Sequence, residues 1–239
     1  MVAIFVVLTI IVFLLIDYAV QRFQARSAAA QPPQGTPEQS QPTILLSPDS
    51  IVVPSTLLFH RGHTWLKFMT SMQARAGLDD FAQKVFGQIE GLQFPRVGEH
   101  ISQGHPLFQV RIGKHKLFLP APISGVVTRL NPDLAAHPEI IHSSPFDAGW
   151  VCEITPSETA QGMEELLSGP DAVQWELHEM NKLQRFLAGR QAALPKVSQR
   201  ELLLSRSWTS DCARHEMNEF SKSFLGVDRD RAELLTEVS

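Results

Sequence analysis

The residue best placed to do chemistry in this sequence is a lysine between two strand-like runs. Residues 108–112 alternate between apolar and polar side chains, and a second such run covers residues 115–119. Gly113 and Lys114 separate the two runs, and glycine supplies the positive φ that a two-residue hairpin turn requires at its first position. The pattern therefore predicts an antiparallel hairpin with Lys114 exposed at its tip.

Histidines are the next candidates, because the chain has nine of them. His60 and His63 are three positions apart, whereas His100, His105 and His115 are scattered over strand-like and loop segments. No cysteine or pair of carboxylates completes either set at a recognised zinc spacing. We therefore predict no metal site, and we expect His63 to be a packed or capping residue.

Nucleophilic and nucleotide chemistry lack their usual motifs. The two cysteines, Cys152 and Cys212, are too few for a disulfide scaffold or a cysteine-rich zinc module. Cys152 lies in the apolar run 150–154, which indicates a buried and inert thiol. The sequence contains no Gly-x-Ser-x-Gly motif and no glycine-rich phosphate loop. It therefore predicts neither an enzyme nor a protein with a small-molecule substrate of its own.

Length and charge exclude further classes. The chain has 239 residues, enough for one well-buried domain with extensions. Its net charge of −4 provides no basic field for nucleic acid. Charged residues make up 19% of the chain, below the roughly 25% typical of soluble domains. Some apolar residues are therefore expected outside a water-facing globule.

The N-terminal segment contains such residues. Residues 2–20 are apolar apart from Asp17, and at about 1.5 Å per residue they span close to the ~30 Å hydrocarbon layer. A cleaved signal peptide is the alternative, but the basic n-region is missing and the apolar run is long. Because Arg22 and Arg26 follow it, the positive-inside rule places the N-terminus outside and the main domain in the cytoplasm. We expect a single-pass protein of the cell (inner) membrane, with a transmembrane helix over residues 1–22.

The rest of the chain divides by composition. Residues 23–43 are rich in Gln, Pro, Ala and Ser and predict a disordered linker, which a connecting segment over residues 44–58 follows. A domain is predicted over residues 59–188. The remaining residues, 189–239, form a polar extension that we expect to be partly helical or disordered.

Within that domain, short strand-like runs between Gly and Pro dominate up to residue 154. One helical pattern interrupts them, with Asp79 or Asp80 as its N-cap and Gly87 at its end. A longer helix is predicted between Gly169 and Gly189, from apolar residues at helical spacing: Val173, Leu177, Met180, Leu183 and Leu187. A second, less regular helix is expected around residues 212–225.

Motifs of the strand-rich region resemble, in order, those of the H protein of the glycine cleavage system. They cover about residues 59–188, just over half of the chain. They are His63-Thr64-Trp65-Leu66, Gly77-Leu78-Asp79-Asp80-Phe81-Ala82-Gln83, Phe94-Pro95-Arg96-Val97-Gly98-Glu99, Ala121-Pro122-Ile123-Ser124-Gly125, Asn131-Pro132, Pro145-Phe146-Asp147-Ala148-Gly149-Trp150 and Glu164-Glu165-Leu166-Leu167.

This resemblance implies a mainly β fold, the lipoyl-type flattened β-barrel (barrel-sandwich hybrid), with two antiparallel sheets and flanking helices. In that family a lysine at a hairpin tip carries lipoate as a swinging arm between enzymes. Counting back from Ala121-Pro122, the modified lysine falls on Lys114, the residue that the turn pattern already places at a tip.

The sequence departs from the family next to that lysine. The family's usual context is Glu-Ser-Val-Lys-Ala, and here the acidic position is Arg111, while His115 and Lys116 follow the lysine. A reversed charge opposes recognition by an attachment enzyme that reads the surface of the hairpin. The expectation is therefore an unmodified Lys114 and no cofactor, with lipoate on Lys114 as the alternative.

Three functions follow from these features. The first is a non-catalytic, membrane-anchored module, similar to the H protein, that acts in protein–protein interaction with an unidentified partner. The second is a true lipoyl carrier, with lipoyl-Lys114 shuttling intermediates between enzymes. The third is a membrane-fusion-type adaptor, which would require the opposite orientation and a long helical hairpin within the barrel.

Overall fold

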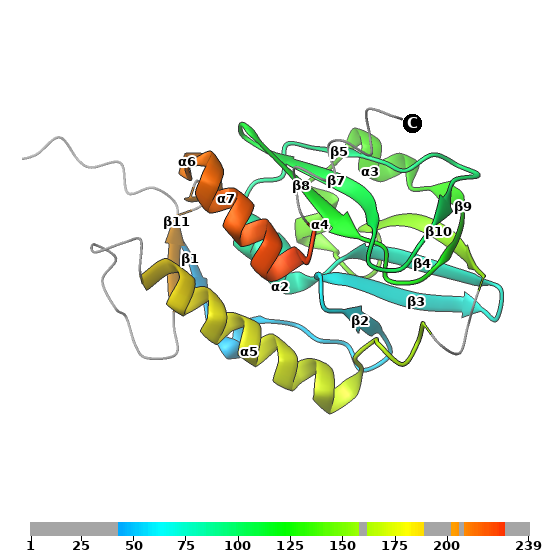
Figure 1. Ribbon diagram of the computed structural model, residues 1–239, viewed down its shortest axis with the longest axis horizontal. Helices are drawn as coiled ribbons and strands as arrows, with labels where there is room; N and C mark the ends of the chain where they lie inside the picture. Colours follow the sequence, from blue (N-terminus) through cyan, green and yellow to red (C-terminus); the bar gives the residue numbers. More distant parts are fainter. Residues whose placement is uncertain (1–42, 158–161, 189–201, 206–207, 228–239) are drawn as a thin grey trace, which may run out of the picture. The chain divides into compact units, whose positions relative to one another are not determined.

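The computed structural model describes residues 43–157, 162–188, 202–205 and 208–227 (Figure 1). The predicted transmembrane helix over residues 1–22 and nearly all of the predicted linker lie outside these ranges. Within them, no helix combines the length and apolar character needed to cross a membrane. The membrane anchor and its orientation therefore stay predictions.

The larger sheet has six antiparallel strands in the order β2-β3-β4-β10-β9-β6. The register of β10 shifts between Trp150 and Cys152 against β4, and between Glu153 and Ile154 against β9. Such bulges bend a strand and increase its twist. The six strands are β2 (Leu58–His60), β3 (Thr64–Thr70), β4 (Gln73–Leu78), β6 (His100–Ile101), β9 (Gly125–Leu130) and β10 (Trp150–Pro156).

The smaller sheet has the order β5-β7-β8, formed by β5 (Gly91–Gln93), β7 (Pro106–Ile112) and β8 (His115–Pro120). Ile112 pairs with His115, so Gly113 and Lys114 form a two-residue turn, and Gly113 has φ 54°. The predicted hairpin is confirmed.

The two sheets share one apolar core. Buried side chains from both sheets form a single cluster that includes Ala76, Leu78, Val110, Leu117, Val127 and Ile154. The larger sheet is curled into a half-barrel, so the mainly β prediction is confirmed and the arrangement is consistent with a lipoyl-type fold.

Short helices connect the strands. The helix α2 (Asp80–Phe86) starts where the sequence predicts, because the Asp79 side chain accepts a hydrogen bond from the backbone N–H of Ala82. It ends at Gly87, whose φ is 70°. Two further helices, α3 (Pro132–Ala136) and α4 (Ile140–Ser143), lie between β9 and β10.

The long helix α5 (Gly169–Ala188) is confirmed, but the side it buries differs from the predicted stripe. Val173 is 40% exposed, whereas Ala172 and Trp175 are buried together with Met180, Leu183 and Leu187. The buried stripe is therefore rotated by about one residue at the start of the helix, where the Trp175 ring packs against His63 in the turn between β2 and β3.

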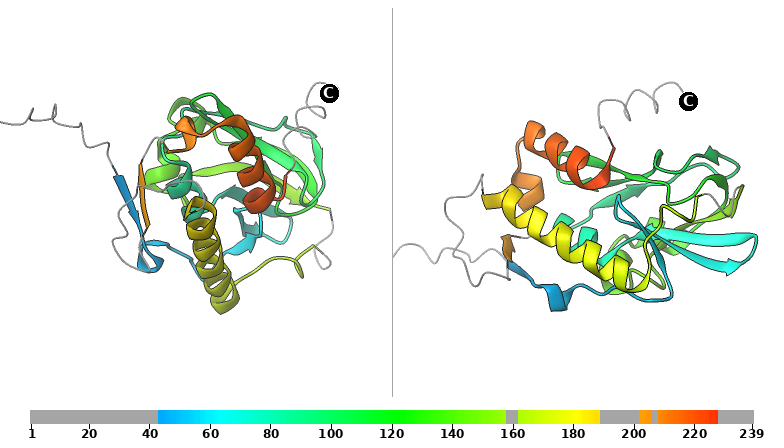
Figure 2. Two further views of the ribbon diagram at one scale, coloured as in Figure 1. Left: turned by 60° about the vertical axis from the view of Figure 1, so that its left-hand side comes forward. Right: turned by 60° about the horizontal axis from the view of Figure 1, so that its bottom comes forward.

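The ends of the described chain also carry structure. The strand β1 (Thr43–Leu46) pairs antiparallel with β11 (Leu202–Ser205), and the short 3-10 helix η1 (Pro48–Ser50) follows β1. The predicted helix near residues 212–225 is present as α7 (Arg214–Phe220) and a π-helical turn, η2 (Ser221–Leu225), after the short helix α6 (Trp208–Asp211). Figure 2 shows α2, α5 and α7 gathered at one side of the two sheets.

Candidate functional site

Lys114 lies at the tip of the β7–β8 hairpin and is exposed. Its neighbour His115 is only 1% exposed, and the Nε2 atom of His115 is 3.0 Å from the carbonyl oxygen of Cys212. The turn therefore presents an exposed lysine side chain beside a residue that contacts the C-terminal segment.

The charge around Lys114 differs from the charge that the sequence predicts. Arg111 forms an ion pair with Glu90, with 2.5 Å between Nη1 and Oε2, and its Nη2 donates to the Glu90 carbonyl oxygen. Glu90 precedes β5, the strand beside β7, and its backbone N–H donates to the Arg111 carbonyl oxygen. Since Arg111 is paired and His115 is buried, Lys116 is the exposed basic neighbour that remains.

The segment from Trp208 to Val227 packs beside this hairpin (Figure 1). Val227 and Phe118 of β8 form a small buried cluster. A side chain at Gly62 would collide with the carbonyl oxygen of Leu225, so the turn before β3 also lies against this segment.

The same segment caps α2. The indole Nε1 of Trp208 donates to the Val85 carbonyl oxygen at 2.6 Å, and the Thr209 hydroxyl donates to the Phe86 carbonyl oxygen at 2.7 Å. These carbonyls belong to the last turn of α2, where no intrahelical donor is available. Sequence reasoning missed this capping, because nothing local in residues 208–209 indicates a partner in α2.

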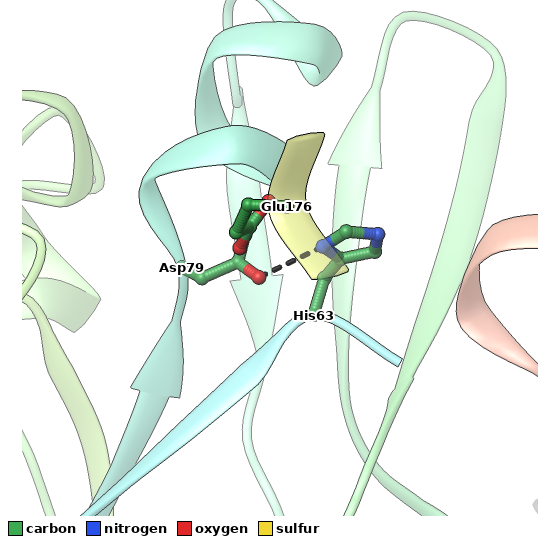
Figure 3. Close-up of side chains that lie close together, drawn as sticks. All are labelled: His63, Asp79 and Glu176. Carbon is green, nitrogen blue, oxygen red and sulfur yellow. Dashed lines mark hydrogen bonds and ion pairs between the residues drawn. The ribbon is translucent and has the colours of Figure 1, made fainter. Parts of the chain in front are cut away.

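A second group of chemistry-bearing side chains lies inside the molecule (Figure 3). His63, Asp79 and Glu176 each offer one ligand atom, and these atoms lie within 4.8 Å of one another. The Nδ1 atom of His63 is 2.8 Å from Asp79 Oδ2. All three residues are buried, and they come from the β2–β3 turn, the β4–α2 junction and α5.

The imidazole of His63 is enclosed on every side. It stacks on Phe81 at 4.7 Å and lies 4.9 Å from the Trp175 ring. Its Nε2 atom is 3.8 Å from Glu179 Oε2, and Lys182 Nζ is 2.9 Å from that same oxygen. His63 adopts φ 63°, a conformation that few non-glycine residues occupy.

Electrostatics couple these groups. Burial by itself lowers the pKa of His63, but the charge and hydrogen bond of Asp79, with Glu179 and Glu176, raise it to about 10. Burial, together with the Asp79 charge, raises the pKa of Glu176 well above its usual value. The cluster therefore holds its protons unusually tightly.

The other predicted site residues do not converge. His60 accepts a hydrogen bond from the Gly62 N–H through Nδ1, and His100 and His105 border a separate surface cavity of about 670 Å³. Cys152 is fully buried, and burial, followed by the charges of Glu153 and Glu99, raises the pKa of its thiol. The expectations of a packed His63 and a buried Cys152 are confirmed.

Comparison with known proteins gives a consistent result. Residues 57–179 match the family model described as Glycine cleavage H-protein. The chain is 33% identical over 108 residues to the glycine cleavage system H protein of Mycobacterium avium (strain 104), covering 45% of this chain and 82% of that protein. It is 36% identical over 116 residues to the H protein of Oceanobacillus iheyensis, covering 48% of this chain and 90% of that protein.

A similar solved structure is the crystal structure of a glycine cleavage system H protein from Mycobacterium marinum. It has 24% sequence identity and a TM-score of 0.47, and the superposition covers 53% of this chain and 98% of that one.

Proposed function

Because the chain belongs to the glycine cleavage H-protein family, we propose that its domain is a lipoyl carrier with lipoate attached to Lys114. Members of this family are lipoyl carrier proteins and are not enzymes themselves. This proposal reverses the preference drawn from the sequence, in which the unmodified interaction module stood first.

The observation that carries the proposal is the position of Lys114 on a rigid hairpin tip. Ladder pairing holds both sides of the turn from Pro106–Pro120 to Ile112–His115, and the lysine itself is exposed. Gly113 places no side chain next to the lysine amine. An attachment enzyme that reads a folded hairpin would thus meet an ordered surface with an accessible nucleophile.

Lipoate would supply a dithiolane that accepts electrons and carries a reaction intermediate. The residues of the chain would then have one task, which is to hold the amide-linked arm at a fixed base. His115 contributes to that base, because it is buried and contacts the Cys212 carbonyl oxygen.

The pairing of Arg111 with Glu90 weakens the main objection to modification. From the sequence alone, Arg111 is expected to be an unpaired positive charge that repels the attachment enzyme. In the structure the acidic side chain of Glu90, the residue before the neighbouring strand β5, is bound to it, so this surface presents both signs of charge. Exposed ion pairs contribute little to stability, but they change the local field that a partner encounters.

Membrane tethering and the partner are further parts of the proposal. The uncharged N-terminal run supports a helix that holds the carrier at the cytoplasmic face of the cell membrane. A carrier needs enzymes that load and unload its arm, so the partners would be proteins that reach the same surface.

Intact-mass spectrometry of the full chain, produced in cells that contain a lipoate attachment enzyme, tests the proposal. We expect the native chain to carry the added mass of one lipoyl group, Lys114→Arg to carry none, and Lys116→Arg to keep it. Glu90→Gln should slow the modification by about fivefold, because it leaves Arg111 unpaired. A native chain without the added mass would contradict the carrier and favour the unmodified interaction module.

A further inference from the structure

We propose that His63, Asp79 and Glu176 bind a divalent transition-metal ion, with zinc as the ion that the donors fit best. The site would fasten α5 to the six-stranded sheet, and it does not depend on whether Lys114 is modified. The sequence predicted no metal, because the spacing from His63 to its carboxylates follows no known motif.

The donor set has the right chemistry, and its atoms lie close enough to converge on one ion after small side-chain shifts. One imidazole nitrogen and two carboxylate oxygens lie within 4.8 Å of one another (Figure 3). Zinc binds such atoms at about 2.0–2.2 Å, which puts neighbouring ligand atoms roughly 3.4 Å apart. The 2.8 Å between His63 Nδ1 and Asp79 Oδ2 would therefore widen by a few tenths of an ångström as the ion replaces the shared proton.

Glu176 supplies an independent reason to expect a ligand. Its Oε2 atom is buried and has no hydrogen-bond partner among the described residues, and the residue is 4% exposed. A buried carboxylate oxygen without a partner is costly, and native structures contain few such atoms. A metal ion beside Glu176 would satisfy it.

The far side of His63 faces a carboxylate, which is the usual partner of a zinc-binding histidine. The Nε2 atom is also buried and has no hydrogen-bond partner in the part of the chain that the structure describes, and Glu179 Oε2 lies 3.8 Å from it. When Nδ1 binds the metal, the remaining ring proton is on Nε2 and can be donated to Glu179. A carboxylate that receives this proton orients the imidazole and strengthens its bond to the metal. Lys182 holds Glu179 in position.

Charge balance points the same way. Asp79 and Glu176 are both buried, and one divalent ion with a neutral His63 would neutralise the two carboxylates. Without an ion, protons must do so, because two unneutralised carboxylates are costly to bury. Asp79 can bind the ion through Oδ2 alone, because its Oδ1 caps α2.

Burial is compatible with a structural ion. The three donors come from separate parts of the fold, so the complete site forms only when α5 docks on the sheet. The binding free energy of such a site contributes directly to folding. The same donor set argues against Mg²⁺ and Ca²⁺, which require six or more oxygen ligands.

The test uses the full chain purified without chelators and analysed by inductively coupled plasma mass spectrometry. We expect about one zinc ion per native chain and almost none in Glu176→Gln. After unfolding in chelator, refolding with Zn²⁺ should raise the melting temperature by several degrees above refolding without metal, whereas Mg²⁺ should not. Asp171→Asn, an exposed position on the same helix, should behave as the native chain does.

Glu179→Gln gives an independent readout, because it leaves all three donors in place. We expect it to bind zinc 10- to 100-fold more weakly, as loss of the carboxylate behind a metal-binding histidine does. A native chain that contains no metal and whose melting temperature Zn²⁺ does not change would overturn the proposal. So would equal zinc content in the native chain and in folded Glu176→Gln.

Discussion

The charge that individual side chains present at the surface depends on the neighbours that the fold gives them. Arg111 reads as an uncompensated positive charge in the sequence, and Glu90 neutralises it across the β5–β7 pair. His115 reads as a second positive neighbour of Lys114, and it is buried. Of the three basic residues that are expected from the sequence to oppose lipoylation, two therefore add no unpaired, exposed positive charge beside Lys114 in the folded chain.

Stability should fall in mild acid because of His60. Burial, followed by the charges of His63 and Arg61, lowers the pKa of His60 to about 4. A histidine whose pKa is lower in the folded state stabilises the fold above pH 6.5, its unfolded pKa, and this contribution is lost as the pH falls toward 4. The loss of unfolding free energy should be at most about 3 kcal/mol.

Urea denaturation of the native chain and of His60→Gln, repeated between pH 7 and pH 4, measures this effect. The variant should lose less stability than the native chain over that interval, and His105→Gln, at an exposed position, should follow the native curve. Parallel curves for His60→Gln and the native chain would show that His60 does not contribute.

At the scale of elements, the C-terminal helices join the fold through aromatic packing. Phe220 contacts Phe86 of α2 and Phe186 of α5, and Trp208 lies 5.7 Å from Phe220, ring to ring. The segment therefore bridges α2, α5 and the hairpin that bears Lys114. It lies outside residues 57–179, which match the family model, so it is an addition to the part shared with H proteins.

Trp208→Ala should weaken this bridge by about 3–5 kcal/mol. The change leaves a cavity and removes the indole N–H that donates to the buried Val85 carbonyl oxygen. Urea denaturation gives the magnitude, and hydrogen exchange of residues 208–227 shows whether the segment detaches alone or with the whole domain. Arg214→Ala, at an exposed position of α7, is the matched control, and equal stability of the two variants would contradict the bridge.

The whole chain divides into one unit over residues 1–40 and another over residues 41–239. The second unit contains every described strand and helix. The first strand of this unit, β1, pairs with β11. A truncated chain must therefore keep Thr43 to retain this pairing. The sequence predicts a linker up to residue 43, and Thr43 is already paired with Ser205 in β1.

Deleting residues 1–40 should yield a soluble, folded protein that no longer fractionates with membranes, because the apolar run is removed and β1 is kept. Far-ultraviolet circular dichroism and cell fractionation are the measurements. Deleting residues 1–46 is the control, since it also removes β1 and the fully buried Leu46, and it should be clearly less stable. An insoluble 41–239 fragment, or a membrane-bound one, would contradict this boundary.

Local patterns in the sequence determined the elements that local forces build. The Gly113–Lys114 turn, the Asp79 cap of α2 and the helix that starts at Gly169 all depend on neighbours within a few residues, and all three are present. Ordered motifs over half of the chain likewise identified the family. Backbone sterics, capping and hydrophobic periodicity act over short stretches, so one sequence is sufficient to predict them.

Only the tertiary structure decided which distant side chains meet. Glu90 reaches Arg111 because β5 and β7 are neighbours, and Glu176 reaches His63 because α5 docks on the turn between β2 and β3. Trp208 reaches Val85 because the C-terminal segment returns to α2. These contacts depend on sheet order and helix docking, which minimise exposed apolar surface over the whole chain. No spacing along the sequence encodes them, so the charge at the hairpin and the buried histidine cluster could be seen only in the folded molecule.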